Sequence, residues 1–158
     1  MVNNGKTRGE WGDMTLSPIG VIRSPYRTMD EAPFQGRFSA EEEEIEICED
    51  YSDGLKDVEA SRHLIVLYWG HLADRGVLQT VTPWGPEVRG VFACRSPSRP
   101  NPVQFCVVEL LRREGNRLVV RGLDAVDGSA VIDIKPYSAR MDSVPGAVIG
   151  WFEEEDGG

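Results

Sequence analysis

The chain has 158 residues, of which 41% are hydrophobic and 27% charged, and its formal net charge is −9. This length and apolar fraction fit one domain around one hydrophobic core. The longest apolar run, residues 64–69, is far shorter than the roughly 20 residues of a membrane-spanning helix, and the polar start of the chain does not resemble a cleavable leader. These properties argue against a helical membrane protein and a secreted protein.

Three short runs in the first half of the chain are predicted as strands. Residues 19–23 form a β-type run that Ser24 and Pro25 end, and residues 44–48 alternate charged side chains with isoleucine, as a half-buried strand does. Residues 63–69 are continuously apolar and rich in β-forming side chains. This third run predicts a fully buried central strand.

Residues 52–62 form the one segment whose pattern indicates a helix. Leu55, Val58 and Glu59 have helical spacing, and Ser52 or Asp53 could cap the N-terminus. One short helix is therefore expected between the second and third strands.

The second half of the chain continues the β pattern. Residues 88–94 and 103–111 are predicted as strands that enter and leave a proline-rich loop, residues 113–116 as a hairpin turn, and residues 118–123 and 130–134 as further strands. Short strands at regular spacing with little helix are typical of an all-β sandwich or barrel.

The domain is expected to occupy residues 15–152. Residues 1–14 and the acidic residues 153–158 are predicted to be flexible tails, because little in either segment could anchor it to a core.

Three cysteines, Cys48, Cys94 and Cys106, are an odd number without Cys-x-x-Cys spacing. Each lies in or beside an apolar run, which predicts buried free thiols. Free thiols are typical of a reducing compartment, so a cytoplasmic protein is expected.

The charges are unevenly distributed. Residues 86–121 hold seven arginines against three glutamates, a local balance of +4 within an acidic chain. One positive face could therefore meet nucleic acid. The alternative is that the arginines at positions 112, 113, 117 and 121 only solvate the outside of a hairpin.

Residues 95–102 read Arg-Ser-Pro-Ser-Arg-Pro-Asn-Pro, with three prolines in eight residues. Each proline restricts its own backbone and the residue before it, so the loop is expected to be rigid. A rigid loop would hold Arg95, Arg99 and Asn101 in place to bind a carboxylate, a phosphate or a nucleobase edge. The plain alternative is a proline-rich connector between two strands.

A second polar cluster follows. Residues 123–129 form a turn with Asp124 and Asp127, and residues 131–137 form a strand that ends in Lys135, Pro136 and Tyr137.

With both clusters in view, the chain resembles the TsaA-like family, whose characterised members are the TrmO tRNA methyltransferases. The Arg-Pro-Asn-Pro element and the later Asp-Ile-Lys-Pro-Tyr element are its most specific motifs. The matching segments are residues 19–26, 54–59, 90–96, 99–102 and 127–137, with His63, Leu64 and His71.

The resemblance implies a compact single-domain β-barrel with a few short helices. It implies an enzyme that uses S-adenosyl-L-methionine to methylate N6 of threonylcarbamoyladenosine in tRNA near the anticodon. It also implies a homodimer that binds the cofactor near the subunit interface.

Carried over by position, the resemblance implies a set of cofactor contacts. Arg95 would pair with the methionine carboxylate of the cofactor, because an arginine fork matches that geometry. Asn101 would contact the cofactor or else hold the proline loop together. The expected cofactor-binding residues are Ser24, Pro25, Tyr26, His71, Arg95, Asn101, Phe105, Asp127 and Gly128.

The expected catalytic residues are Asp127, Lys135 and Tyr137. Asp127 would face the cofactor, and it or His71 could accept a proton, although an Asp-Gly pair is also a common chain-reversing turn. Lys135 would attract the acidic substituent of the base, and Tyr137 would stack on the base or else end a half-buried strand. Two histidines without paired cysteines predict no metal site.

Two departures from the family pattern leave other functions open. Gln104 and Phe105 stand where the family usually has a small residue, and the chain ends at Gly158, whereas longer bacterial members carry a C-terminal domain. The alternatives are the same cofactor with another RNA or a small-molecule acceptor, or a non-catalytic S-adenosylmethionine-binding module.

Overall fold

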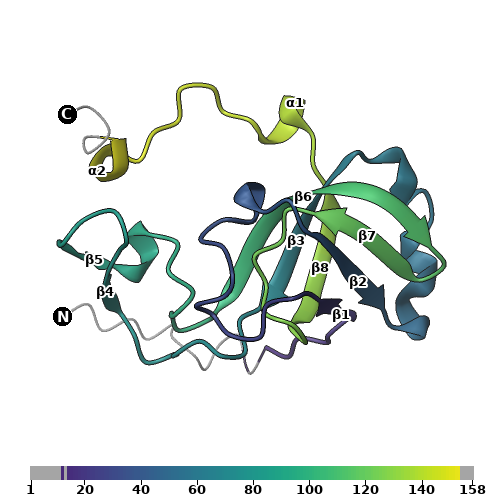
Figure 1. The fold of residues 1–158 in the computed structure, drawn as a ribbon, viewed down its shortest axis with the longest axis horizontal. Coiled ribbons are helices and arrows are strands. Elements are labelled where there is room, and N and C mark those ends of the chain that lie inside the picture. The colour runs from purple at the N-terminus through teal and green to yellow at the C-terminus, as the bar shows by residue number, and fades with distance from the viewer. Residues whose placement is uncertain (1–11, 13, 154–158) are drawn as a thin grey trace.

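The computed structural model describes residue 12 and residues 14–153, and its centre is a closed antiparallel β-barrel (Figure 1). The strands follow one another around the barrel in the order β1-β2-β7-β6-β3-β8. Their bounds are β1 Gly20–Arg23, β2 Glu42–Ile47, β3 His63–Trp69, β6 Val103–Glu114, β7 Arg117–Arg121 and β8 Ala130–Pro136. The predicted all-β barrel is confirmed.

The core fills the barrel because alternate side chains of each strand point inward. In β3, Leu64, Val66 and Tyr68 are buried while their neighbours are half-buried or exposed. The prediction that this strand is buried on both faces is therefore wrong. A strand of a barrel has an outer face, and apolar residues such as Ile65 and Leu67 occupy that face here.

Strand β6 is long enough to pair with two neighbours. Residues 103–109 pair with β3, and residues 109–114 pair with β7. Gly115 makes the hairpin turn with a φ of 66°, in the region that favours glycine.

The helix predicted over residues 52–62 is not continuous. The segment forms two short 3₁₀ helices, η2 (Glu49–Leu55) and η3 (Val58–Ala60), separated by Asp57 with a φ of 65°. Leu55 is buried against the barrel, so tertiary packing selects the tighter turns over the predicted α-helix.

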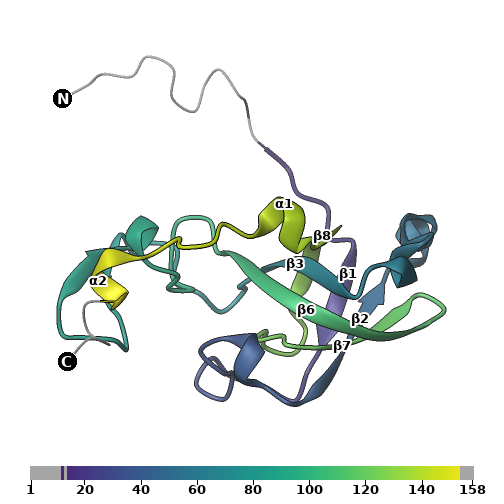
Figure 2. The same ribbon diagram turned by 90° about the horizontal axis from the view of Figure 1, so that it is seen from above.

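A small lobe stands beside the barrel (Figures 1 and 2). It contains the two-stranded sheet of β4 (Gln79–Val81) and β5 (Val88–Gly90), followed by η4 (Val91–Ala93). The strand predicted over residues 88–94 thus ends at Gly90, and β4 was not predicted because its three residues have no clear periodicity.

The C-terminal part of the described chain leaves the barrel and reaches the lobe. Helix α1 (Ala139–Asp142) follows β8, and α2 (Gly150–Glu153) lies beside β4 and β5 (Figure 1). The Trp151 indole donates a hydrogen bond to the Ala93 carbonyl at 3.1 Å, and the rings of Trp84 and Phe152 meet edge to face at 5.1 Å. Aromatic contacts therefore attach this segment to the lobe.

The thiols differ in exposure. Cys106 is buried as predicted, Cys94 is half-buried, and Cys48 is exposed, which corrects the prediction for that residue. Cys48 follows the last inward side chain of β2 and lies outside the barrel wall.

Two predictions concern the ends of the chain. Residues 1–11, 13 and 154–158, which make up most of the predicted tails, lie outside the described residues. Within the described part, none of the helices has the length and hydrophobicity needed to traverse a lipid bilayer.

Candidate functional site

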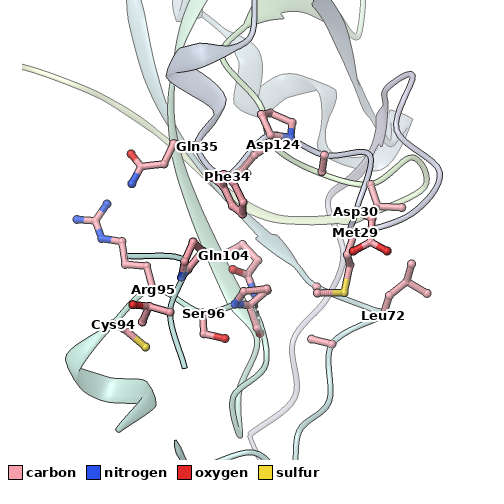
Figure 3. A pocket seen from close by; sticks show the side chains of 18 of the residues that line it. Met29, Asp30, Phe34, Gln35, Leu72, Cys94, Arg95, Ser96, Gln104 and Asp124 are labelled. Carbon is pink, nitrogen blue, oxygen red and sulfur yellow. Dashed lines mark hydrogen bonds between the residues drawn. The ribbon is translucent and has the colours of Figure 1, made fainter. Parts of the chain in front are cut away.

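A cavity of about 550 Å³ lies between the barrel and the lobe (Figure 3). Its volume falls within the range of roughly 300–1,000 Å³ that is typical of small-molecule sites. Aromatic side chains form one wall, with the rings of Phe34 and Trp84 6.4 Å apart and Trp151 and Phe152 next to them. Such a wall can stack against a planar ligand group.

Polar side chains occupy part of the cavity rim. Figure 3 shows Gln35 and Arg95 on one side of the cavity and Met29, Asp30 and Leu72 on the other. The guanidinium of Arg95 lies 5.8 Å from the centre of the Phe105 ring. Among the described residues, no carboxylate forms an ion pair with Arg95, so its charge is available to an anionic ligand.

A hydrogen-bonded cluster lies at the floor of the cavity. The Tyr68 hydroxyl donates to Asp124 Oδ1 at 2.6 Å, and the Cys106 thiol donates to the same oxygen at 2.8 Å. Burial, followed by the nearby Asp124 charge, raises the pKa of Tyr68 and of Cys106 well above their usual values. Both groups therefore keep their protons and act as donors to the carboxylate.

Behind this cluster, Glu43 of β2 is only 1% exposed. Neither of its carboxylate oxygens makes a well-formed hydrogen bond, although the backbone amides of Leu123 and Gly122 lie near enough to favour the charged form. Burial, with smaller contributions from the charges of Glu41 and Asp124, raises the pKa of Glu43 to about 7. Glu43 is thus a carboxyl group that can take up a proton near neutral pH.

The structure brings together two segments that were predicted to bind the cofactor, residues 24–26 and the turn that holds Asp127 and Gly128. The Ser24 backbone N–H donates to Asp127 Oδ1 at 3.1 Å, and the Asp127 N–H donates to the Tyr26 carbonyl at 2.6 Å. The Ser24 hydroxyl also donates to the Ala125 carbonyl at 2.7 Å. These contacts join the segment 24–26 to the turn 125–128 beside the cavity.

Neighbours of the turn line the cavity. Val126 and Ser129 belong to the lining, whereas Asp127 and Gly128 are exposed and lie outside it. Ser24, Pro25 and Tyr26 are likewise outside the lining in a single chain. Their predicted role in cofactor binding therefore stays a prediction.

The proline loop is held from several sides. Arg75 donates to the Pro100 carbonyl at 2.7 Å and to Asn101 Oδ1 at 3.3 Å, and Arg99 donates to the carbonyls of Val91 and Cys94. Asn101 thus takes part in holding the loop, which was one of its two predicted roles. The loop in turn places Arg95 in the cavity lining.

Three further residues, His71, Gln104 and Phe105, differ in their relation to the cavity. His71 lines it, as does Gln104, whose amide donates to the Pro97 carbonyl at 3.1 Å. Phe105 points to the other side of β6 and is 48% exposed, next to Arg95.

Lys135 and Tyr137 lie at the opposite end of β8 from Ser129, which lines the cavity. Lys135 pairs with Asp133 at 2.8 Å and lines a second hollow of about 380 Å³ with Leu55. A seven-residue strand spans about 20 Å. Within one chain these two residues do not reach the cavity, and their catalytic role stays a prediction.

The end of the barrel at Gly36, Tyr68 and Asp124 is the cavity end, and the end at Leu55 and Lys135 is the opposite end.

Sequence reasoning missed several cavity residues. Phe34, Gln35 and Trp84 lie in segments without periodicity, and Tyr68 lies in a run that reads as core. Glu43 belongs to an acidic run, which is usually solvent-exposed. Asp124 was visible only as a polar residue of the turn that precedes β8.

The arginines of the β6–β7 hairpin follow the second interpretation given above. Arg112, Arg113, Arg117 and Arg121 each lie within ion-pair distance of at least one glutamate, including Glu42 and Glu114. Their charges are largely compensated on the outside of the barrel. In the described part of the chain, no group of three or more His, Cys, Asp or Glu is placed to hold a metal ion.

The chain is similar to one family of known proteins. The model of the tRNA-methyltransferase O N-terminal domain matches residues 21–143. A "Probable S-adenosyl-L-methionine-binding protein" of Archaeoglobus fulgidus is 59% identical over 139 residues, which are 88% of this chain and 38% of that protein. A second A. fulgidus protein, an "S-adenosyl-L-methionine-binding protein", is 57% identical over 131 residues, 83% of this chain and 94% of that protein.

Longer relatives match over their corresponding part. The tRNA (adenine(37)-N6)-methyltransferase of Escherichia coli strain K12 is 36% identical over 146 residues, which are 82% of this chain and 60% of that enzyme. The solved structure of TrmO from Pseudomonas aeruginosa superposes with a TM-score of 0.75 and 32% identity, over 90% of this chain and 64% of that one. This chain therefore spans less than two thirds of both.

Proposed function

This chain belongs to the tRNA-methyltransferase O family, and from that premise we propose that it is an S-adenosyl-L-methionine-dependent methyltransferase that modifies tRNA. We infer N6 of a threonylcarbamoyladenosine near the anticodon as the acceptor. The observation that carries the proposal is the match over residues 21–143, which includes nearly all of the barrel and most of the cavity lining. The named activity of the E. coli relative supports the reaction class.

The cavity fits the cofactor. The aromatic wall of Phe34 and Trp84 suits the adenine ring, and Arg95, free of any described ion pair, suits the methionine carboxylate. When bound, S-adenosylmethionine supplies an electrophilic methyl group on a sulfonium. The protein then has to orient the acceptor nitrogen and exclude water, and the proline loop, held by Arg75 and Arg99, supports that positioning.

The tRNA backbone needs cations that glutamates do not already neutralise. The hairpin arginines are ion-paired, whereas Arg95 in the cavity lining and Arg75 against the proline loop have no described acidic partner. We therefore place the RNA on the rim side and not on the β6–β7 face.

The remaining assignments are part of the same proposal. Asp127 contributes to the cofactor site through its turn, and Lys135 and Tyr137 act on the modified base from a second copy of the chain. A homodimer is supported by exposed apolar side chains such as Phe92 (83%) and Val144 (71%). The reaction takes place in the cytoplasm, where tRNA, cofactor and free thiols coexist.

Calorimetric titration with S-adenosylmethionine is the first test. Saturable binding that Arg95→Ala weakens, and that Arg95→Lys weakens less, supports the cofactor site. Methyl transfer from labelled cofactor to threonine tRNA, with and without the threonylcarbamoyl group, tests the acceptor. Transfer that persists without this group contradicts the proposed substrate, and light scattering of the purified protein tests the dimer.

One observation favours a second candidate function. The A. fulgidus relatives, at 59% and 57% identity, are named only as S-adenosylmethionine-binding proteins. A module that binds the cofactor without using it would give saturable titration and no transfer to any tRNA.

A further inference from the structure

We propose that Asp124 is the proton acceptor of the methyl transfer and that Tyr68 and Cys106 position it. This inference rests on the proposed function. The observation that motivates it is a carboxylate at the cavity floor, held by two donors from two different strands.

Asp124 is the better placed of the two aspartates in the turn. Its side chain lines the cavity and is half-buried, whereas Asp127 is exposed and its Oδ1 accepts the Ser24 N–H. A partly desolvated carboxylate interacts more strongly with charge that develops beside it.

The geometry leaves one carboxylate oxygen available. Tyr68 of β3 and Cys106 of β6 both donate to Oδ1, and no described residue donates to Oδ2. Both donors remain protonated because burial raises the pKa of each. Two fixed donors orient the group, so Oδ2 can accept a hydrogen bond from a substrate N–H.

The charges around Asp124 are compatible with this role. The titratable groups that face it are Tyr68 from β3, Cys106 from β6 and Glu43 from β2. Tyr68 and Cys106 are neutral, and Glu43, with a pKa of about 7, is partly protonated near neutral pH. Protonation of Glu43 reduces the negative charge beside Asp124.

The step balances without a further reactant. The acceptor nitrogen uses its electron pair to form the N–CH₃ bond, and the S–CH₃ bond breaks with its electron pair retained on sulfur. The N–H proton passes to Asp124 Oδ2, and solvent then removes it. General-base assistance of this kind contributes about 10²–10⁴-fold to rate.

Asp124→Asn tests the proposal, with Asp53→Asn as the matched control on the exposed surface of η2. We expect Asp124→Asn to bind S-adenosylmethionine within about threefold of wild type by calorimetry and to lose at least about 100-fold in single-turnover transfer. Asp53→Asn should retain both. Equal transfer by Asp124→Asn and wild type would overturn the assignment, as would a loss of cofactor affinity that accounts for the whole effect.

Tyr68→Phe and Cys106→Ser test the positioning role and remain informative if Asp124→Asn does not fold. Removing the Tyr68 donor leaves the carboxylate less well oriented, so single-turnover transfer should fall by about tenfold or more while the Kd for S-adenosylmethionine stays within about threefold of wild type. Serine restores a donor, so Cys106→Ser should lose less transfer than Cys106→Ala. Transfer rates equal to wild type in Tyr68→Phe and Cys106→Ala, or reduced rates explained wholly by weaker cofactor binding, would overturn the positioning role.

The design separates this inference from the proposed function. A wild-type protein that does not bind S-adenosylmethionine, or binds it without transfer to tRNA, overturns the proposed function and this assignment with it. If the wild-type protein transfers methyl groups to tRNA and Asp124→Asn transfers them equally fast, the assignment of Asp124 is overturned and the proposed function stands.

Discussion

The same six strands run between the cavity end and the opposite end of the barrel, but the polar side chains at the two ends have different environments. At the cavity end, Asp124 is half-buried and accepts two hydrogen bonds from side chains that burial keeps protonated. At the opposite end, Lys135 is exposed, and its one ion pair among the described residues is with Asp133, two residues away.

This difference shows which end can do chemistry in a single chain. Hydrogen bonds and charges are stronger where water is excluded, whereas an exposed ion pair contributes little. Both ends carry residues of the family motifs, so the motifs alone do not distinguish them. The following predictions test the contrast, from the largest expected effect to the smallest.

Gly36→Ala should destabilise the cavity end severely. A Cβ at Gly36 would overlap the Gly122 carbonyl and lie 2.8 Å from the Leu123 carbonyl carbon, and backbone cannot move aside cheaply. We expect a loss of at least about 3 kcal/mol in urea unfolding, at the upper end of the usual cost of overpacking.

Gly54→Ala is the matched change at the opposite end. No described residue outside its own chain neighbourhood lies within 4 Å of its added Cβ, so this variant should be stabilised by about 0.4–1 kcal/mol. Equal stability of the two variants would contradict the tight packing of Gly36 on residues 122–123.

Glu43→Gln should change how stability depends on pH. The pKa of Glu43 is raised to about 7 in the folded protein, so the folded state binds more protons than the unfolded state between about pH 4.5 and 7. Wild-type stability therefore falls as pH rises through this window, by roughly 3 kcal/mol, and levels off above it.

The variant removes this slope and should be the more stable protein at pH 8. Urea unfolding at pH 5 and pH 8 measures the effect. Glu46→Gln, on the same strand but half-exposed, should leave the slope in place. A wild-type stability that does not fall over this range would show that Glu43 is less buried than described.

Arg95→Ala and Lys135→Ala compare the two ends in cofactor binding. Loss of a charge-assisted pair at Arg95 should raise the Kd for S-adenosylmethionine by about 10-fold or more. Lys135→Ala should leave the Kd unchanged because Lys135 lies outside the cavity of its own chain and is proposed to contact the base, not the cofactor. Calorimetry measures both variants, and a large effect of Lys135→Ala would contradict the placement of Lys135 away from the cofactor.

Arg117→Ala should have the smallest effect. Its ion pairs with Glu44 and Glu114 are 3.7 and 3.9 Å long and exposed, on the outer face beside the β6–β7 turn. We expect the urea midpoint and transfer to tRNA to stay within error of wild type. A clear loss of tRNA affinity would instead place RNA on the hairpin face.

Much of the barrel could be predicted because local patterns agree with it. The alternation of glutamate and isoleucine in residues 42–47 and the apolar run of residues 63–69 each correspond to one strand. The helix over residues 52–62 was predicted wrongly because helical spacing cannot reveal that Leu55 must reach the core through a 3₁₀ turn.

The sequence by itself determined the strand content, the rigid loop that carries Arg95 and the family to which the chain belongs, because periodicity, proline and short motifs are local properties. Only the tertiary structure decided that Tyr68, Cys106 and Asp124 meet and that Glu43 is buried rather than solvated. These residues are 18 or more positions apart and come together through the closure of the barrel. Closure selects which face of each strand points inward, and no local pattern encodes that choice for a polar side chain.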